Sequence, residues 1–172
     1  RTIERFGRLD VLVNNAGWTR LVEHADLDAL TDEILLRTFQ VNVFGTWWLT
    51  RAAMPYLRRS PDPNVVMVTS VAGVRPVGSS IAYAMSKAAL NHLTALLAKS
   101  CGPVRVNAVA PGLVDTPLSA DLKEQHAAVA ATVPLHRSAR PDDCAEAVIA
   151  LLRNAYVTGH VLVVDGGSSL VW

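Results

Sequence analysis

Short apolar runs alternate with longer segments of helical periodicity along this chain. Runs of strand length occur at residues 9–13, 65–69, 104–110 and 157–164. The longest helix-like segments between them span residues 31–59, 80–99 and 141–152. Strands separated by helices pair in parallel, because a crossover helix returns the chain to the same end of the sheet. The pattern therefore predicts an α/β fold, with a parallel sheet covered by helices on both faces.

Two of the predicted helices carry almost no charge. Within residues 39–57 the single charged residue is Arg51, and within residues 80–99 Lys87 is the single charge before the last position. A helix that is apolar nearly all round must be covered on more than one side. We expect one side of each helix to pack on the sheet and the other to face a second subunit. A bend is expected in the first helix near Asn42 or Gly45, and residues 18–30 should form a loop with a short helical piece.

Polar and turn-forming residues follow three of the predicted strands. Asn14-Asn15-Ala16-Gly17 follows the first strand, Ser70 the second and Pro111-Gly112 the third. The carboxyl ends of parallel strands meet at one edge of the sheet, which is where open α/β sheets bind ligands. Each turn could instead be an ordinary structural connection, and for Pro111-Gly112 alone that interpretation is favoured.

Tyr83 and Lys87 lie four residues apart in a predicted helix, so they share one face with Cβ atoms about 5–6 Å apart. A nearby ammonium group favours the ionised phenol, and lowering the pKa of Tyr83 by about three units requires roughly 4 kcal/mol. Such a phenol could exchange a proton with a bound oxygen atom, which Ser70 could also hold by a hydrogen bond. A lone Tyr-x-x-x-Lys usually marks an ordinary surface helix, but here a serine precedes it by thirteen residues.

Composition narrows the class of protein. The 172 residues are 51% hydrophobic and 18% charged, which suits one domain with a doubly covered sheet. A net charge of +1 gives no reason to expect nucleic acid or an anionic membrane as a partner. Cys101 and Cys144 are too few for a disulfide scaffold, and the five His residues lack metal-ligand spacing. No apolar run reaches the roughly 18 residues of a membrane span, so we expect a soluble cytoplasmic protein without a metal site.

Four blocks of this sequence, in this order, resemble the short-chain dehydrogenase/reductase family. They are Asn14-Asn15-Ala16-Gly17, Ser70 with Tyr83-x-x-x-Lys87, Asn107-Ala108-Val109-Ala110-Pro111-Gly112 with Thr116, and Val163-Val164-Asp165-Gly166-Gly167. The similarity spans nearly the whole chain. It implies a Rossmann-like doubly wound parallel sheet, and a single domain over residues 1–172 that forms homodimers or homotetramers through helices 31–59 and 80–99.

The resemblance also implies a role for each matching residue. Tyr83 would be the acid/base, Lys87 would lower its pKa and grip a ribose, and Ser70 would polarise a carbonyl group. Asn42 would support a proton relay through its backbone, although such an asparagine in a packed helix is more often structural. The cofactor would be NAD or NADP, held by Asn15, Ala16, Gly17, Tyr83, Lys87, Pro111, Gly112, Val114 and Thr116. Residues 118–133 would form a mobile helical flap over the substrate.

The beginning of the chain leads to an expectation about what precedes it. Residues 1–7 look like the tail of a helix, and no G-x-G motif for a cofactor pyrophosphate occurs anywhere. Compared with the family, about 70 residues with the first strand and its glycine loop are expected to be absent, counted as two βαβ units. If 172 residues are the whole polypeptide, strand 9–13 becomes an exposed apolar edge prone to association.

Two functions of different classes remain open at this point. The first is an NAD(P)-dependent oxidoreductase that transfers hydride between a nicotinamide cofactor and a carbonyl or secondary alcohol. The second is a catalytically inactive, truncated homologue that acts as a dimerisation or interaction module. A hydrolase that uses Ser70 is weakly supported, because no G-x-S-x-G motif occurs. The sequence identifies neither the substrate nor the choice between NAD and NADP.

Overall fold

The computed structural model describes residues 1–171 and contains one four-stranded parallel sheet. Its strands are β1 (Val11–Asn14), β2 (Asn64–Val68), β3 (Arg105–Pro111) and β4 (Val161–Val164), and they lie side by side in sequence order. In the parallel register Asn14 pairs with Met67, and Val68 pairs with Val109. The carboxyl ends of these strands therefore meet at one edge, and the predicted α/β parallel sheet is confirmed.

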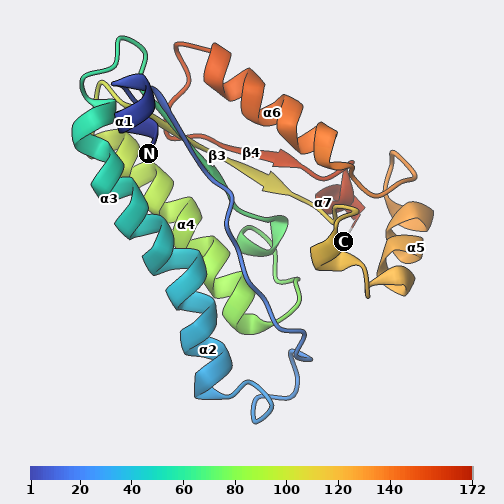
Figure 1. Cartoon of the computed structure of the whole chain (residues 1–172). Helices are drawn as coiled ribbons and strands as arrows, with labels where there is room; N and C mark the ends of the chain where they lie inside the picture. The colour runs from blue at the N-terminus through green and yellow to red at the C-terminus, as the bar shows by residue number, and fades with distance from the viewer. Residues whose placement is uncertain (172) are drawn as a thin grey trace.

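Helices cover both faces of the sheet (Figure 1). On one face α3 (Thr46–Leu57) and α4 (Ile81–Ser100) enclose a core with strand residues such as Val65, Met67 and Val106. On the other face α6 (Pro141–Arg153) packs on Val66 and Val109. Successive strand residues thus point to opposite helical layers, as expected of a strand that is buried on both sides.

The predicted helix over residues 31–59 is one continuous helical segment with a π-helical turn. It begins with α2 (Asp32–Phe39), passes through the π turn Gln40–Gly45 and continues as α3. The Thr31 side chain accepts the Ile34 N–H at its start. The irregularity falls where the sequence predicts a bend, and such turns are frequent at functional sites.

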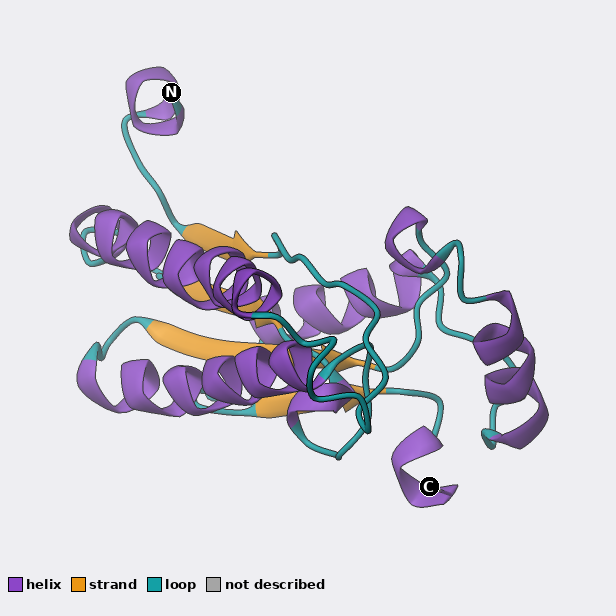
Figure 2. Ribbon diagram, turned by 90° about the horizontal axis from the view of Figure 1, so that it is seen from below, coloured by secondary structure: helices purple, strands orange, loops and turns teal. Residues whose placement is uncertain are grey.

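Helix α4 begins at Ile81, two residues before Tyr83, and carries the candidate catalytic pair in its first two turns. The Ser80 hydroxyl caps it by accepting the Tyr83 N–H at 3.2 Å. The shorter elements are α1 (Thr2–Phe6), α5 (Lys123–Thr132) and α7 (Ser168–Val171), with 3-10 turns at Val71–Gly73 and Pro117–Ser119. Figure 2 shows α1 standing away from the sheet, beyond the C-cap Gly7. None of the helices within residues 1–171 combines the length and apolar character needed to cross a membrane.

Two predicted elements differ from the structure. Residues 18–30 contain turns but no helix, because their backbone bonds to another loop: the Val22 N–H donates to Ser79 O at 2.8 Å. The last strand begins at Val161 rather than at residue 157. The chain turns before it, where Gly159 has a φ of 76°, a conformation that interrupts a strand.

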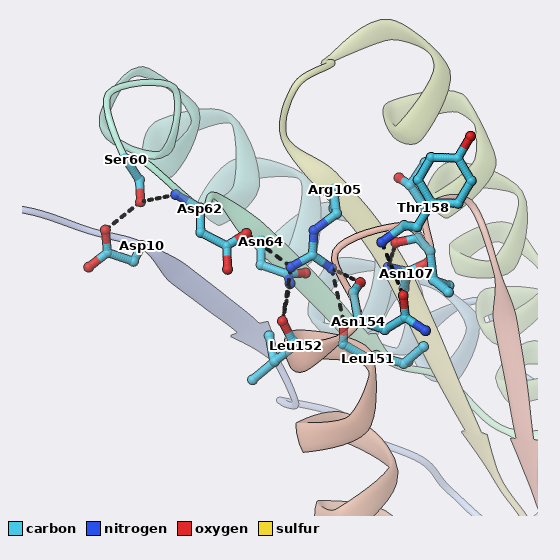
Figure 3. Close-up of polar contacts among 12 residues, drawn as sticks. Asp10, Ser60, Asp62, Asn64, Arg105, Asn107, Leu151, Leu152, Asn154 and Thr158 are labelled. Atoms are coloured by element: carbon cyan, nitrogen blue, oxygen red, sulfur yellow. Dashed lines mark hydrogen bonds and ion pairs between the residues drawn. The ribbon is translucent and has the colours of Figure 1, made fainter.

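A buried arginine joins the sheet to the end of α6 (Figure 3). The Arg105 side chain donates to the carbonyl oxygens of Leu151, Leu152 and Asn154 at 2.8–3.0 Å. It also pairs with Asp62 at 3.1 Å, although Asp62 is 69% exposed. These carbonyl groups lie at a helix C-terminus and lack intrahelical partners, so the guanidinium group satisfies them and fixes α6 on the sheet.

Candidate active site

Ser70, Tyr83 and Lys87 come together at the carboxyl end of β2. Ser70 follows this strand by two residues, and its hydroxyl accepts the Ala72 N–H at 3.1 Å. The same hydroxyl is close enough to the Tyr83 phenol to lower its pKa. The Lys87 Nζ atom lies 5.5 Å from the centre of the Tyr83 ring. The structure therefore places the three side chains in one cluster, as the spacing predicts.

Lys87 is held with part of its hydrogen-bonding capacity free for a ligand. Its side chain is buried, and Nζ donates to Val68 O at 2.9 Å, its one hydrogen bond within residues 1–171. An ammonium group has three N–H donors. Gly17 lies beside it, and a Cβ atom added there would be 3.6 Å from Nζ. A side chain at Gly17 would therefore occupy space next to the ammonium group that a ligand hydroxyl could use.

Asn42 is buried and joins three segments through its side chain. Its Oδ1 accepts the Trp18 N–H at 2.7 Å, and its Nδ2 donates to Trp18 O at 3.0 Å and to Ser86 Oγ at 2.9 Å. Ser86 in turn donates to the Tyr83 carbonyl. The side chain of Asn42 is thus structural, and it fixes the π turn against the helix that carries Tyr83. Its backbone carbonyl accepts the Thr46 hydroxyl at 2.7 Å.

The first candidate cofactor block lies at the same edge of the sheet. Asn15, Ala16 and Gly17 are exposed just beyond β1. Asn14, which the sequence suggests as part of the turn, is instead the last residue of β1, and its buried side chain donates to Thr50 Oγ1 on α3 at 3.0 Å. The exposed trio is therefore anchored by a residue that faces the core.

The second candidate block follows β3. Pro111 is the last strand residue, and Gly112 is so close to Asp165 that an added Cβ would lie 3.0 Å from its Cα. Val114 pairs with Ala139, and the Thr116 side chain caps the 3-10 turn Pro117–Ser119. The Thr116 hydroxyl accepts one backbone N–H in this cap, which leaves its proton free to donate. The loop thus runs along the edge that carries Ser70.

The pKa of Tyr83 is shifted in the direction opposite to the sequence-based prediction. Although the ring keeps some solvent contact, burial raises the pKa of the phenol, and the hydrogen bond with Ser70 only partly opposes this. Burial also lowers the pKa of Lys87 to about 8. Desolvation disfavours the charged form of each group and is the largest cause of both shifts. The phenol therefore carries its proton at neutral pH.

Burial of Lys87 makes the stability of the protein depend on pH. The pKa of Lys87 is about 8 in the folded protein against an ordinary value of 10.5, so between these values the unfolded chain binds more protons. Stability should rise as pH increases through this window, by about 2 kcal/mol at pH 9.5. Chemical denaturation at pH 7 and pH 9.5 measures the change, and Lys87→Met should remove it. The matched variant at an exposed lysine, Lys99→Met, should keep it, and an equal rise in all three proteins would refute the assignment to Lys87.

Comparison with known proteins identifies the family. A family model described as enoyl-(acyl carrier protein) reductase matches residues 1–169. A solved short-chain dehydrogenase/reductase from Burkholderia xenovorans is 39% identical, with a TM-score of 0.91 over 98% of this chain and 68% of that chain. This chain belongs to the short-chain dehydrogenase/reductase family. The Rossmann-like fold implied by the sequence is thereby confirmed.

Two further proteins that resemble this chain have names that state an activity or a bound ligand. A protein of Streptomyces violaceoruber, named as ketoacyl reductase 2 of granaticin polyketide synthase, is 53% identical over 98% of this chain and 70% of its own length. The structure of ElxO with NADP bound is 29% identical, with a TM-score of 0.88 over 98% of this chain and 70% of that chain. The family assignment makes this protein an oxidoreductase.

Proposed function

We propose that this protein reduces a carbonyl group with NADH or NADPH, and that Tyr83 protonates the substrate oxygen. The observation that carries the proposal is the cluster of Ser70, Tyr83 and Lys87 at the carboxyl end of β2, with the phenol neutral beside a hydroxyl. A neutral phenol suits donation to an oxygen atom that gains negative charge. The names of two relatives, a ketoacyl reductase and a 3-oxoacyl-[acyl-carrier-protein] reductase, make 3-oxoacyl thioesters the first substrates to assay.

The described residues fit a nicotinamide cofactor. Lys87 has N–H donors in reserve beside the space at Gly17, which suits the hydroxyls of a ribose. Asn15, Ala16 and Gly17 would line the adenosine side, while Pro111, Gly112, Val114 and Thr116 would line the nicotinamide and phosphate side. The NADP-bound structure of the related ElxO supports this assignment. When bound, the nicotinamide supplies the hydride or accepts it in the reverse direction.

The protein's own residues would orient the carbonyl group and move the proton. The Ser70 hydroxyl donates to the carbonyl oxygen and holds it next to the phenol. As negative charge develops on this oxygen, Tyr83 Oη transfers its proton to it. The Lys87 ammonium then stabilises the phenolate that remains, because opposite charges attract more strongly in a buried site than in water. The Asn42 carbonyl would support the return of a proton from solvent.

An assay of the purified full-length protein tests this function. Oxidation of NADPH and of NADH is followed with a 3-oxoacyl thioester, and an enoyl thioester serves as the comparison substrate because the matched family model is described as an enoyl reductase. We expect turnover of the ketone and little of the alkene, since Ser70 and Tyr83 are arranged to bind and protonate an oxygen atom. A protein that binds neither cofactor and reduces neither substrate would overturn the proposal and favour the interaction-module alternative.

We also propose that the outer faces of α3 and α4 form a homo-oligomer interface. Phe44, Trp47, Trp48 and Leu49 are 40–53% exposed at one end of this surface, with the Phe44 and Trp48 rings 6.1 Å apart. Apolar patches of this kind on a soluble protein usually mark an interaction site. Trp48→Glu should convert the oligomer to monomer in sedimentation velocity experiments, whereas Tyr156→Glu, at an exposed site elsewhere, should not. A wild-type monomer, or an oligomer that survives Trp48→Glu, would count against this interface.

A further inference from the structure

Helix α5 lies outside the two layers that cover the sheet. Figures 1 and 2 both show it at the rim of the molecule, beyond the carboxyl ends of the strands. No residue of α5 is buried. Hydrophobic packing therefore contributes little to holding this helix in place, and specific polar contacts must contribute more than they do for α4 or α6.

One side chain of α5 makes two such contacts. His126 Nε2 lies 3.2 Å from Ser119 Oγ, and His126 Nδ1 lies 2.7 Å from Ser138 Oγ. Within residues 1–171, no other α5 side chain forms a hydrogen bond to a different element. His126 therefore links the flap helix at once to the loop before it and to the segment that leads into α6.

Ser119 connects His126 with the candidate cofactor loop. The Ser119 side chain is buried; its hydroxyl donates to Val114 O at 2.5 Å and accepts the Thr116 N–H at 3.2 Å. A serine hydroxyl has one proton, so with that proton on Val114 its oxygen remains an acceptor for His126 Nε2–H. The Nδ1 atom of neutral His126 is then free to accept the Ser138 hydroxyl. One consistent set of donors and acceptors thus runs from the flap to both Val114 and Thr116.

We propose that His126 is a positioning residue that fastens the flap to the cofactor loop through Ser119. It touches neither of the reacting groups; it acts by holding Ser119, which in turn fixes the backbone at Val114 and Thr116. This role rests on the proposed function, because those two residues are assigned there to the cofactor. Loss of the histidine should loosen the flap and, through Ser119, weaken cofactor binding.

Amide replacements separate the two contacts of the imidazole. A glutamine side chain can place its amide near the position of Nε2 and retain the Ser119 contact, whereas asparagine can reach only the position of Nδ1 and the Ser138 contact. His126→Gln should therefore preserve the function of the residue, and His126→Asn should resemble His126→Ala. Gln125→Ala is the matched control, since Gln125 is exposed on the same helix.

Limited trypsin digestion of the cofactor-free full-length protein tests whether His126 holds the flap in place. Lys123 is exposed at the start of α5, and cleavage after it reports opening of the flap. We expect cleavage about fivefold faster in His126→Ala and His126→Asn than in wild type, and near-wild-type rates in His126→Gln and Gln125→Ala. Equal cleavage rates in His126→Ala and Gln125→Ala would overturn the proposal. Equal cleavage rates in His126→Asn and His126→Gln would overturn it as well.

Fluorescence titration with NADPH tests the coupling to the cofactor. The Kd should rise about fivefold in His126→Ala and stay near the wild-type value in His126→Gln. An unchanged Kd in His126→Ala, despite faster cleavage, would contradict the coupling through Ser119. If wild-type protein bound no nicotinamide cofactor, the proposed function would fail, whereas the fastening would still be decided by the cleavage rates.

Discussion

Tyr83→Phe should lower kcat for carbonyl reduction by about 10²–10⁴-fold, which is the range that a positioned proton donor contributes. The phenylalanine ring fills the same space beside Lys87, but it has no proton to give to the substrate oxygen. The Ser70 hydroxyl remains next to the substrate oxygen in this variant. It cannot replace the phenol as proton donor, because an aliphatic hydroxyl is far less acidic than a phenol. Steady-state kinetics with NADPH and a 3-oxoacyl thioester measure the loss.

The affinity for NADPH distinguishes a chemical defect from a folding defect. It should change little in Tyr83→Phe, because the ring and the Lys87 ammonium remain in place. Tyr156→Phe is the control, since Tyr156 is fully exposed and the same atom is removed there. A Tyr83→Phe protein that reduces its substrate at the wild-type rate would remove Tyr83 from the mechanism.

Arg105→Met should destabilise the fold by about 3 kcal/mol, measured by chemical denaturation. The methionine can fill much of the volume, but it leaves the carbonyl groups of Leu151, Leu152 and Asn154 without their charged donor. Hydrogen bonds to charged groups contribute about 1.5–3 kcal/mol each, and a buried acceptor left unsatisfied costs about 1–3 kcal/mol. Water can reach part of this helix end in the variant and bond to the freed carbonyl groups. The total loss of stability is therefore smaller than the sum of the contributions of the individual hydrogen bonds.

Two control variants show which contact of Arg105 matters. Asp62→Asn should cost less than about 1 kcal/mol, because Asp62 is largely exposed and its ion pair is screened by solvent. Arg153→Met, at an exposed arginine in the last turn of α6, should cost little as well. If Asp62→Asn were as damaging as Arg105→Met, the ion pair would be the main contribution and the carbonyl contacts would be secondary.

The sequence predicts the sheet and its functional edge because both depend on local patterns. Apolar runs identify the four strands, helical segments between them require parallel pairing, and parallel pairing gathers the strand ends. Ser70, Tyr83 and Lys87 could therefore be placed in one cluster from their spacing alone. The sequence also predicts a bend near Asn42 or Gly45, and the π turn Gln40–Gly45 lies at that place, but its π-helical form was not predicted.

Other features depend on contacts between residues far apart in the sequence. Nothing around Arg105 indicates that its partners are carbonyl groups of a helix some 46 residues later. His126 looks like one of five scattered histidines, and only the fold brings Ser119 and Ser138 to either side of it. The predicted direction of the Tyr83 pKa shift was wrong for the same reason. Sequence spacing indicates how far Tyr83 lies from Lys87, but it does not indicate how deeply the phenol is buried, and burial is the largest cause of the shift.

The π turn Gln40–Gly45 also has a consequence for how the protein can vary. A π turn holds one more residue than the α-helical turn it replaces, so side chains beyond it are rotated by about 100° relative to an uninterrupted α-helix. That offset lets Asn42 point inward to Trp18 and Ser86 while Trp47 and Trp48 point outward. Losing a single residue there would turn this segment into regular α-helix and leave Trp47 and Trp48 on their present face, but it would remove the widened turn from which Asn42 contacts Trp18 and Ser86.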